Sequence, residues 1–471
     1  MIFLLSYVLL LYLGGQQNLF VRDGDVYFHI ATGQWILSHH AVPTSDPFFS
    51  ETVAGHPWIV YYWLSDVLLA LSLKAFGWLG ILILPALAVS TSLAILASYL
   101  RKRVGFWFTL IAIILSLDIL LWRIMPRPHI VELPFATLWF IGFIRARAEN
   151  SAPSYWYLLP LLLWVNLHGV ESAIAIVIAG TFFLEASIYS RKTDNGLVVL
   201  KQWKIFFLLS CIVSLMTPYT YKTWAITSFL VNSNTHAYVT EWFPTGCRLL
   251  PLNCWIVLVI TAGFGLGLRV PWFRLMMFLG LTLLTFAHWY VLTLFSIFAP
   301  LLLADSFHQV LPWRNALEQK YAKTKPARII LIPFIIMIAI ITVYASQRIH
   351  FEKNNVFTPV SAVDFAEKNG LVGKRLLNIF EQGGYLIYRG VPAFIDPRIE
   401  LFDLHFYEDN QNKVSLLREG LTGFERYLNQ NKIVWIMLPP SMPSTVALLH
   451  SKQWKYVYAD PYAVVFVRKK P

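Results

Sequence analysis

The sequence has little charge, almost no cysteine and none of the common hydrolase or ATPase motifs. Only 14% of its 471 residues are charged, whereas soluble domains have about a quarter. Three cysteines are too few for a disulfide framework. The absence of HExxH, GxSxG and Walker A patterns leaves zinc hydrolase, serine hydrolase and P-loop ATPase functions without support.

Apolar residues take the place of the missing charge. Hydrophobic residues make up 57% of the chain and aromatic residues 16%, which is the composition of a multi-pass membrane protein. A net charge of +12 can indicate a nucleic-acid partner, but here Lys and Arg form small clusters at the ends of apolar segments. That distribution is typical of charges that orient membrane spans, so we expect no nucleic acid.

The apolar segments predict about eleven membrane spans, several shorter than the ~20 residues that a perpendicular helix needs. The first is interpreted as a retained span, because it lacks the basic start and cleavage site of a signal peptide. Segment Tyr61–Phe76 carries Asp66 and Lys74, which are costly in a lipid-facing span, so we place it along the interface. The predicted spans cover roughly 2–20, 79–100, 104–122, 130–144, 153–167, 170–189, 204–218, 252–268, 275–288, 289–304 and 329–346.

The basic clusters predict the orientation of these spans. With Tyr61–Phe76 at the interface, most clusters fall on one side, which becomes the cytoplasmic side. The N-terminus is then cytoplasmic and the C-terminus is outside. Polar side chains gather on the outer face, where they predict a cavity at the membrane boundary. They are Asp23, Asp25, His29, Asp46, Arg123, Arg127, His129, Asn166, His168, Tyr219, Glu241 and His288.

The first outer loop is long and polar, and it begins with two carboxylates that flank Gly24. Asp23 or Asp25 could take a proton from an acceptor hydroxyl, or both could hold a divalent cation, which prefers oxygen ligands. Asp and Gly also favour plain turns. The position directly after the first span favours a functional role, with Asp46 and Glu241 as further candidates for the base.

Several other outer residues have two interpretations. Arg127 can be an interfacial anchor or a clamp for a lipid phosphate, because guanidinium matches phosphate oxygens bidentately. Asn166 and His168 can be satisfied helix-end residues or can face the cavity. Trp58 can stack on a sugar or anchor the loop. His288 alone is typical of packing.

The composition becomes less apolar after the last span. Residues 347–471 predict a small α/β domain, with a helix at 359–370 that ends at Asn-Gly and another at about 413–429. Strands are predicted at 375–380, 385–390, 391–396, 433–438, 456–460 and 463–469. The segment FIDPRIELFD is unusual because it concentrates Asp396, Arg398, Glu400 and Asp403.

The order of these motifs resembles a known superfamily. One span is followed by DGD, GQWILSHHAVPTSDPFF, and YYWLSDVLLALSLKAFGW, and then by RPH, WVNLHG, TPY and GGYLIYRGVPAFIDPRIELF. This resembles the GT-C superfamily of polytopic glycosyltransferases, in a bacterial branch near the polyprenyl-phosphate-mannose and aminoarabinose transferase types. The similarity covers most of the chain, although each motif is short.

The resemblance implies a mainly α fold: a GT-C-like transmembrane domain over residues 1–346, with juxtamembrane helices in the first outer loop at 21–78, and the extracytoplasmic domain at 347–471. It implies transfer of a sugar from a polyprenyl-phosphate donor to a glycan, lipid or protein acceptor, with inversion, at the outer side of a bacterial plasma membrane. Asp23 and Asp25 are then catalytic. Arg127, with Arg123 or His168, would hold the lipid phosphate.

The resemblance leaves the cofactor and two other functions open. No second acidic motif occurs around Arg123–His129, where metal-dependent members have one, so metal-independent transfer is expected. If Mg²⁺ or Mn²⁺ is used, Asp23 and Asp25 would be its ligands. A lipid-linked saccharide transporter and a non-catalytic assembly partner with the same fold remain alternatives.

Overall fold

The computed structural model describes residues 2–15, 24–48, 52–53, 55–189, 195–232, 244–245, 250–310, 340, 343 and 354–469. The chain divides into two compact units. The first contains Met1–Leu19, Leu79–Thr227 and Val239–Ile349. The second combines Phe20–Trp78 with Ser228–Tyr238 and His350–Pro471, so residues of the first loop and of the C-terminal part of the chain cluster together.

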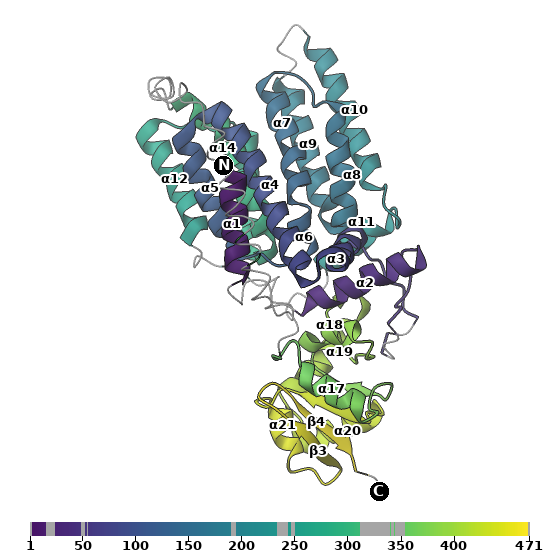
Figure 1. The fold of residues 1–471 in the computed structure, drawn as a ribbon. Helices are drawn as coiled ribbons and strands as arrows, with labels where there is room; N and C mark the ends of the chain where they lie inside the picture. The colour runs from purple at the N-terminus through teal and green to yellow at the C-terminus, as the bar shows by residue number, and fades with distance from the viewer. Residues whose placement is uncertain are drawn as a thin grey trace. The chain divides into compact units, whose positions relative to one another are not determined.

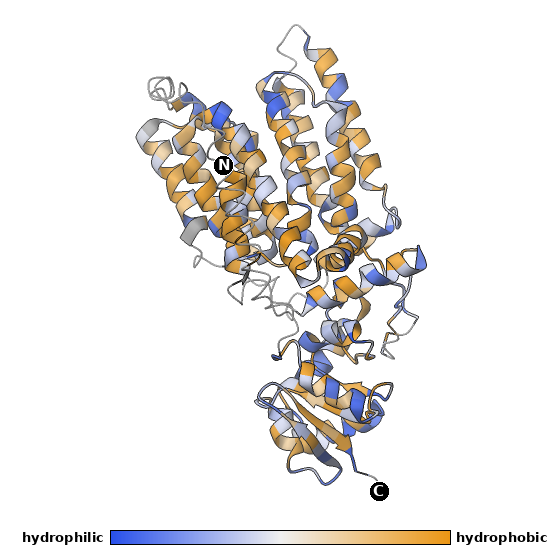
Figure 2. Cartoon of the chain, viewed as in Figure 1, coloured by the Kyte–Doolittle hydropathy of each residue, from blue (hydrophilic) through white to orange (hydrophobic). Residues whose placement is uncertain are grey.

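The first unit is a bundle of apolar helices that run side by side (Figure 1). Hydrophobic residues make up most of their length, and hydrophilic residues lie towards their ends (Figure 2). Its main helices are α1 (Ile2–Gly15), α4 (Trp78–Val104), α5 (Phe106–Leu121), α7 (Leu133–Ala148), α8 (Leu158–Leu167), α9 (Ser172–Tyr189), α10 (Gly196–Ser214), α12 (Leu250–Leu266), α13 (Trp272–Ala287) and α14 (Leu292–Val310). A shorter helix is α6 (Pro128–Val131), and α11 (Lys222–Asn232) starts in this unit while its residues from Ser228 belong to the second.

Four helices of the described part are long and apolar enough to cross a membrane: Trp78–Val104, Gly169–Tyr189, Gly196–Ser214 and Trp289–Val310. Shorter apolar helices accompany them. The protein is thus a multi-pass membrane protein, while the predicted number of eleven spans stays a prediction. The last predicted span, 329–346, lies almost wholly outside the described residues.

Charged pairs lie at the end of the bundle where α4 and α7 finish. Asp305 accepts hydrogen bonds from Arg103 at 2.6 Å and from Arg274 at 2.5 Å. Arg147 and Glu185 form another ion pair there, 3.5 Å apart. Arg145, also in the last turn of α7, adds to the basic character of this end. The sequence places these basic residues together on one predicted side of the membrane, and which side that is stays a prediction.

The second unit begins with two helices packed against each other. They are α2 (Asp25–His39) and α3 (Trp63–Phe76). Gly33 makes the close crossing possible, because a Cβ there would lie 2.0 Å from the backbone oxygen of Asp66. Asp66 is itself fully buried on α3. The charge that is unfavourable in a lipid-facing span therefore lies inside a helix pair of this unit.

The C-terminal part of the second unit is a four-stranded sheet with helices (Figure 1). The strand order is β1-β2-β4-β3, with β1 parallel to β2 and the other pairs antiparallel. The strands are β1 (Leu376–Leu377), β2 (Trp435–Leu438), β3 (Trp454–Ala459) and β4 (Val464–Arg468). The helices are α17 (Val360–Lys368), α18 (Gly383–Tyr388), α19 (Leu404–Asn410), α20 (Gly420–Gln430) and α21 (Pro443–Leu448).

Most predicted elements of this part are present, and two are wrong. The helix ending at Asn-Gly is α17, and Gly370 has the positive φ of 63° that this stop requires. Segment 385–390, predicted as a strand, instead continues α18. Segment 391–396 has no strand, although it was expected to be one. The predicted helix at 413–429 begins later, at Gly420.

Candidate functional site

The loop after the first helix places Asp25 of its acidic motif at the start of α2. Gly24 occupies the N-cap position and Asp25 is the first helical residue. A carboxylate is electrostatically favourable there, because the N-terminal end of a helix carries partial positive charge. Asp23 lies outside the described residues.

The C-terminal part of the chain holds this helix start through three glycines. A Cβ on Gly24 would lie 2.5 Å from the backbone oxygen of Glu381. A Cβ on Gly384 would lie 2.3 Å from the backbone oxygen of Gly24, and one on Gly383 would lie 2.4 Å from the Cα of Asp396. The Gly-Gly pair thus fits between the DGD motif and FIDPRIELFD, where no side chain has room.

Tyr407 adds an electrostatic link to Asp25. The phenol is almost fully buried, and burial is the largest cause that raises its pKa well above the ordinary value. The carboxylates of Asp396, Glu400 and Asp25 raise the pKa further. Asp25 therefore belongs to an acidic environment to which the C-terminal part of the chain contributes.

His29 and Asp66 join α2 to α3. Their Nδ1 and Oδ1 atoms share a buried hydrogen bond of 2.7 Å, and the ring of Tyr62 lies edge-on to the imidazole at 4.7 Å between centroids. Burial, followed by the nearby charge of Glu400, raises the pKa of the Asp66 carboxyl well above its ordinary value. His29, predicted as substrate-binding, thus has a partner within the helix pair.

Asp46 is held by Arg398 from the C-terminal part of the chain. Arg398 donates to Asp46 at 2.5 Å and, bidentately, to Asp396 at 2.7 and 2.8 Å. All three side chains are fully buried, and the guanidinium lies 4.8 Å from the ring centre of Trp58. Asp396 and Asp46 hold the pKa of Arg398 above its ordinary value despite the opposing effect of burial.

Glu400 completes this buried network. It accepts hydrogen bonds from the indole of Trp58 at 2.9 Å and from the hydroxyl of Tyr62 at 3.2 Å. Burial is the largest cause that raises the pKa of its carboxyl. Asp46 and Trp58, predicted to bind substrate, are thus engaged with Arg398 and Glu400.

Other predicted residues lie in the bundle, at the end opposite the Asp305 ion pairs. Arg127 is the N-cap of α6, and Nε2 of His129 donates to the backbone oxygen of Arg123 at 3.3 Å. Asn166 donates to the backbone oxygens of Leu162 and Met216, both at 2.9 Å. It thereby connects the end of α8 to the turn that follows α10.

Tyr219 and His288 lie in connections between helices, and Glu241 lies outside the described residues. Tyr219 is mostly buried in the turn after α10. His288 ends α13, and its ring stacks with that of Tyr290 at 5.8 Å between centroids.

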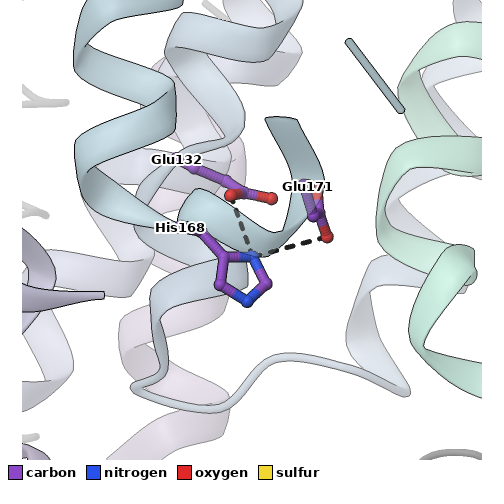
Figure 3. A group of neighbouring side chains, drawn as sticks. All are labelled: Glu132, His168 and Glu171. Carbon is purple, nitrogen blue, oxygen red and sulfur yellow. Dashed lines mark hydrogen bonds and ion pairs between the residues drawn. The ribbon is translucent and has the colours of Figure 1, made fainter. Parts of the chain in front are cut away.

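His168 belongs to a buried cluster with two glutamates (Figure 3). Its Nδ1 lies 3.1 Å from Oε2 of Glu132 and 3.5 Å from Oε1 of Glu171. Glu132 precedes α7, His168 ends α8 and Glu171 lies in the 3-10 turn before α9. Trp164 donates its indole N–H to Glu132 at 3.0 Å, and the charge of Arg123 acts on Glu171.

Glu132, Glu171, Arg398 and Glu400 are partners that sequence reasoning left out of the candidate site. Glu132 follows His129 by three residues, and Glu171 follows His168 at the same spacing. These spacings place pairs of polar groups near one helix end, which was the available signal. Arg398 was noted for its acidic neighbours, but its pairing with Asp46 spans 352 positions and leaves no local pattern.

The chain shares its fold with solved polytopic glycosyltransferases of the GT-C superfamily, so the expected fold is confirmed. The chain is similar to archaeal oligosaccharyltransferases of that class. One is AglB from Archaeoglobus fulgidus in complex with an inhibitory peptide and a dolichol-phosphate, at TM-score 0.56 and 11% identity, covering 99% of this chain and 74% of that one.

Two further solved structures show the same likeness. The apo form of an Archaeoglobus fulgidus oligosaccharyltransferase matches at TM-score 0.54 and 12% identity, over 92% of this chain and 69% of that one. The same enzyme tethered to an acceptor peptide containing the NVT sequon matches at TM-score 0.54 and 11% identity, over 99% and 74%. No family model and no curated protein matches the sequence.

Proposed function

We propose that the protein is a glycosyltransferase that moves a hexosyl or pentosyl group from a polyprenyl-phosphate donor to an acceptor hydroxyl. The acceptor is a glycan, a lipid or a protein, and the reaction takes place on the outer side of a bacterial plasma membrane. The fold shared with oligosaccharyltransferases over nearly the whole chain supports the reaction class. A neighbour that binds dolichol-phosphate and a peptide supports a lipid-linked donor and a separate acceptor.

Asp25 is the proposed general base. It takes the proton from the acceptor hydroxyl while the oxygen attacks the anomeric carbon. The bond from that carbon to the lipid phosphate breaks, and the phosphate leaves with the electron pair, so the configuration at the anomeric carbon is inverted. Since the phosphate leaves already charged, positioning and charge stabilisation carry most of the rate.

Arg127 is the proposed phosphate clamp, with Arg123 beside it in the same connection. Two guanidinium groups can bind the phosphate oxygens and stabilise the charge that grows on the leaving group. We assign the assisting role to Arg123 because Nδ1 of His168 is engaged by Glu132 and Glu171.

The glycine contact at the start of α2 is the observation that most favours Asp25 over the other acids. The C-terminal backbone comes so close to Gly24 that a Cβ on Gly384 would meet its carbonyl oxygen. Such contact holds the first residue of α2 on a rigid frame, as a catalytic group requires. Asp46, in contrast, is buried and uses Oδ1 to accept from Arg398 and from the backbone N–H of Phe48.

The proposal is tested by reconstituting the purified protein in liposomes with a panel of polyprenyl-phosphate-linked sugars. Membrane extract supplies the acceptor, and the release of free polyprenyl phosphate is measured. The acceptor therefore need not be identified. Asp25→Asn is expected to lower the release rate at least about 100-fold, within the range of a lost general base. The matched control is Glu149→Gln, which removes an exposed acid paired with Arg145.

Full release by Asp25→Asn would contradict the proposed base. If the wild-type protein releases no polyprenyl phosphate from any donor but moves the intact donor between leaflets, a transporter would be favoured instead. An intact Asp25→Asn protein that supports normal product in cells would favour a non-catalytic partner.

A further inference from the structure

We propose that Glu132, His168 and Glu171 form a binding site for a divalent transition metal, with Zn²⁺ and Mn²⁺ as the ions it suits. The site lies wholly within the bundle and differs from the cation position considered for Asp23 and Asp25. It does not rest on the proposed glycosyl transfer. The three side chains come from three different connections at one end of the bundle (Figure 3).

The distances between the three groups fit a shared ion. Nδ1 of His168 lies 3.1 Å from an oxygen of Glu132 and 3.5 Å from an oxygen of Glu171, and one ligand atom from each residue lies within 4.8 Å of the others. Ligands at ~2.0–2.1 Å from Zn²⁺ in a tetrahedral arrangement are about 3.3 Å apart. Small side-chain shifts would therefore suffice to coordinate an ion.

Two buried carboxylate oxygens give the second reason. Among the described residues, no donor reaches Oε1 of Glu132 or Oε2 of Glu171, although the two side chains are only 0% and 3% exposed. Leaving a buried polar atom unsatisfied costs about 1–3 kcal/mol, and more when the group is charged. His168 has one proton to offer at Nδ1, which cannot satisfy both acids. A dication bound between the two carboxylates would satisfy both of them.

The surroundings fix the ligands in place. The indole of Trp164 donates to the Glu132 oxygen that faces His168, which is the kind of contact that orients a metal-binding carboxylate. Arg123 contributes one positive charge near Glu171. Two carboxylates, a neutral imidazole and a dication sum to zero, and the positive charge of Arg123 would be offset by an anionic oxygen ligand at the open coordination position.

The donor set indicates which ion is preferred. Imidazole nitrogen suits Zn²⁺ and other transition metals, whereas Mg²⁺ prefers oxygen ligands in octahedral geometry. One nitrogen and two carboxylates are compatible with Zn²⁺ and Mn²⁺, and three protein ligands leave a coordination position for water or another oxygen ligand.

The test uses the full-length protein, purified in detergent, stripped with a chelator and dialysed against Zn²⁺, Mn²⁺ or Mg²⁺ alone. Elemental analysis is expected to find about one Zn²⁺ or Mn²⁺ per chain and no retained Mg²⁺. Glu171→Gln and His168→Asn should each weaken retention at least about 10-fold. Glu185→Gln is the matched control, since it changes a buried acid of the same bundle that pairs with Arg147.

A spectroscopic measurement covers the case in which a variant folds poorly. Electron paramagnetic resonance of the Mn²⁺-loaded wild-type protein should show coupling to an imidazole nitrogen, which His168→Asn should remove. Absence of stoichiometric Zn²⁺ or Mn²⁺, or nitrogen coupling that persists in His168→Asn, would overturn the site. The cluster would then be a protonated hydrogen-bond network. Metal binding is measured without a sugar donor. A failure to bind metal is therefore distinguishable from a failure of the proposed glycosyl transfer.

Discussion

Arg398 provides the sharpest test of how the first loop and the C-terminal part of the chain are joined. The perturbation is Arg398→Met, which keeps much of the side-chain volume and removes the guanidinium. Asp46 and Asp396 then lose the buried guanidinium that they share, and Trp58 loses the cation over its ring. We expect this junction to open far more often than in the wild-type protein.

The magnitude follows from complete burial of the three side chains. Removing one partner of a buried ion pair costs about 3–5 kcal/mol, because the remaining charges keep their desolvation penalty without the attraction. Since ~1.4 kcal/mol corresponds to a factor of ten in an equilibrium constant, local opening should increase about 100-fold or more. Replacing Asp46 and Asp396 by Asn as well should recover part of the loss, because the uncompensated charges are then gone.

Hydrogen–deuterium exchange of the full-length protein in nanodiscs measures this opening. Peptides covering 44–48 and 394–402 should lose protection, and the start of α2 should follow. The matched control is Arg389→Met, which removes a guanidinium that pairs with Asp364 and Glu367 at the surface. Such exposed pairs contribute about 0–1 kcal/mol, so the control should change little. Equal, small effects of both substitutions would refute the reasoning.

Two further predictions concern the same region. Gly384→Ala should shift the start of α2, because the added Cβ would lie 2.3 Å from the carbonyl oxygen of Gly24. Proteolysis should show a loss of stability of about 1–3 kcal/mol. Gly280→Ala is the control and should cause no such loss, because the space around Gly280 is open. Burial raises the pKa of Glu400 above its ordinary value of 4.5, so its folded form binds the proton more tightly than the unfolded chain. The resulting contribution to folding stability is present below pH 4.5 and is lost as pH rises through the raised pKa. Glu400→Gln should therefore flatten the fall in thermal stability above pH 4.5. An unchanged pH profile of thermal stability would contradict this prediction.

Local sequence was sufficient where local contacts decide the structure. The helix of α17 followed from its apolar spacing and its Asn-Gly stop, and β2 and β4 from runs of branched and aromatic residues. The same reasoning fails at 385–390, where YLIYRG has strand propensity but forms α18. Its glycine start packs against Gly24 and Asp396, and this tertiary contact outweighs the local preference.

The candidate residues divide in the same way. The DGD motif was readable because acids beside a membrane segment are unusual, and its placement at a helix start was within reach of the pattern. The contacts of Asp46 and Trp58 could not be predicted from the sequence, because their partners Arg398 and Glu400 lie more than 300 residues further along the chain. Their roles depend on tertiary structure that no local spacing encodes.

A structure of the reconstituted protein with bound polyprenyl phosphate tests the central claim most directly. The account predicts density for the phosphate against the guanidinium of Arg127, with the Asp25 carboxylate facing the position of the anomeric carbon. Phosphate density at the bundle end that carries Asp305, or a bound lipid with Asp25 and Arg127 at opposite ends, would contradict it.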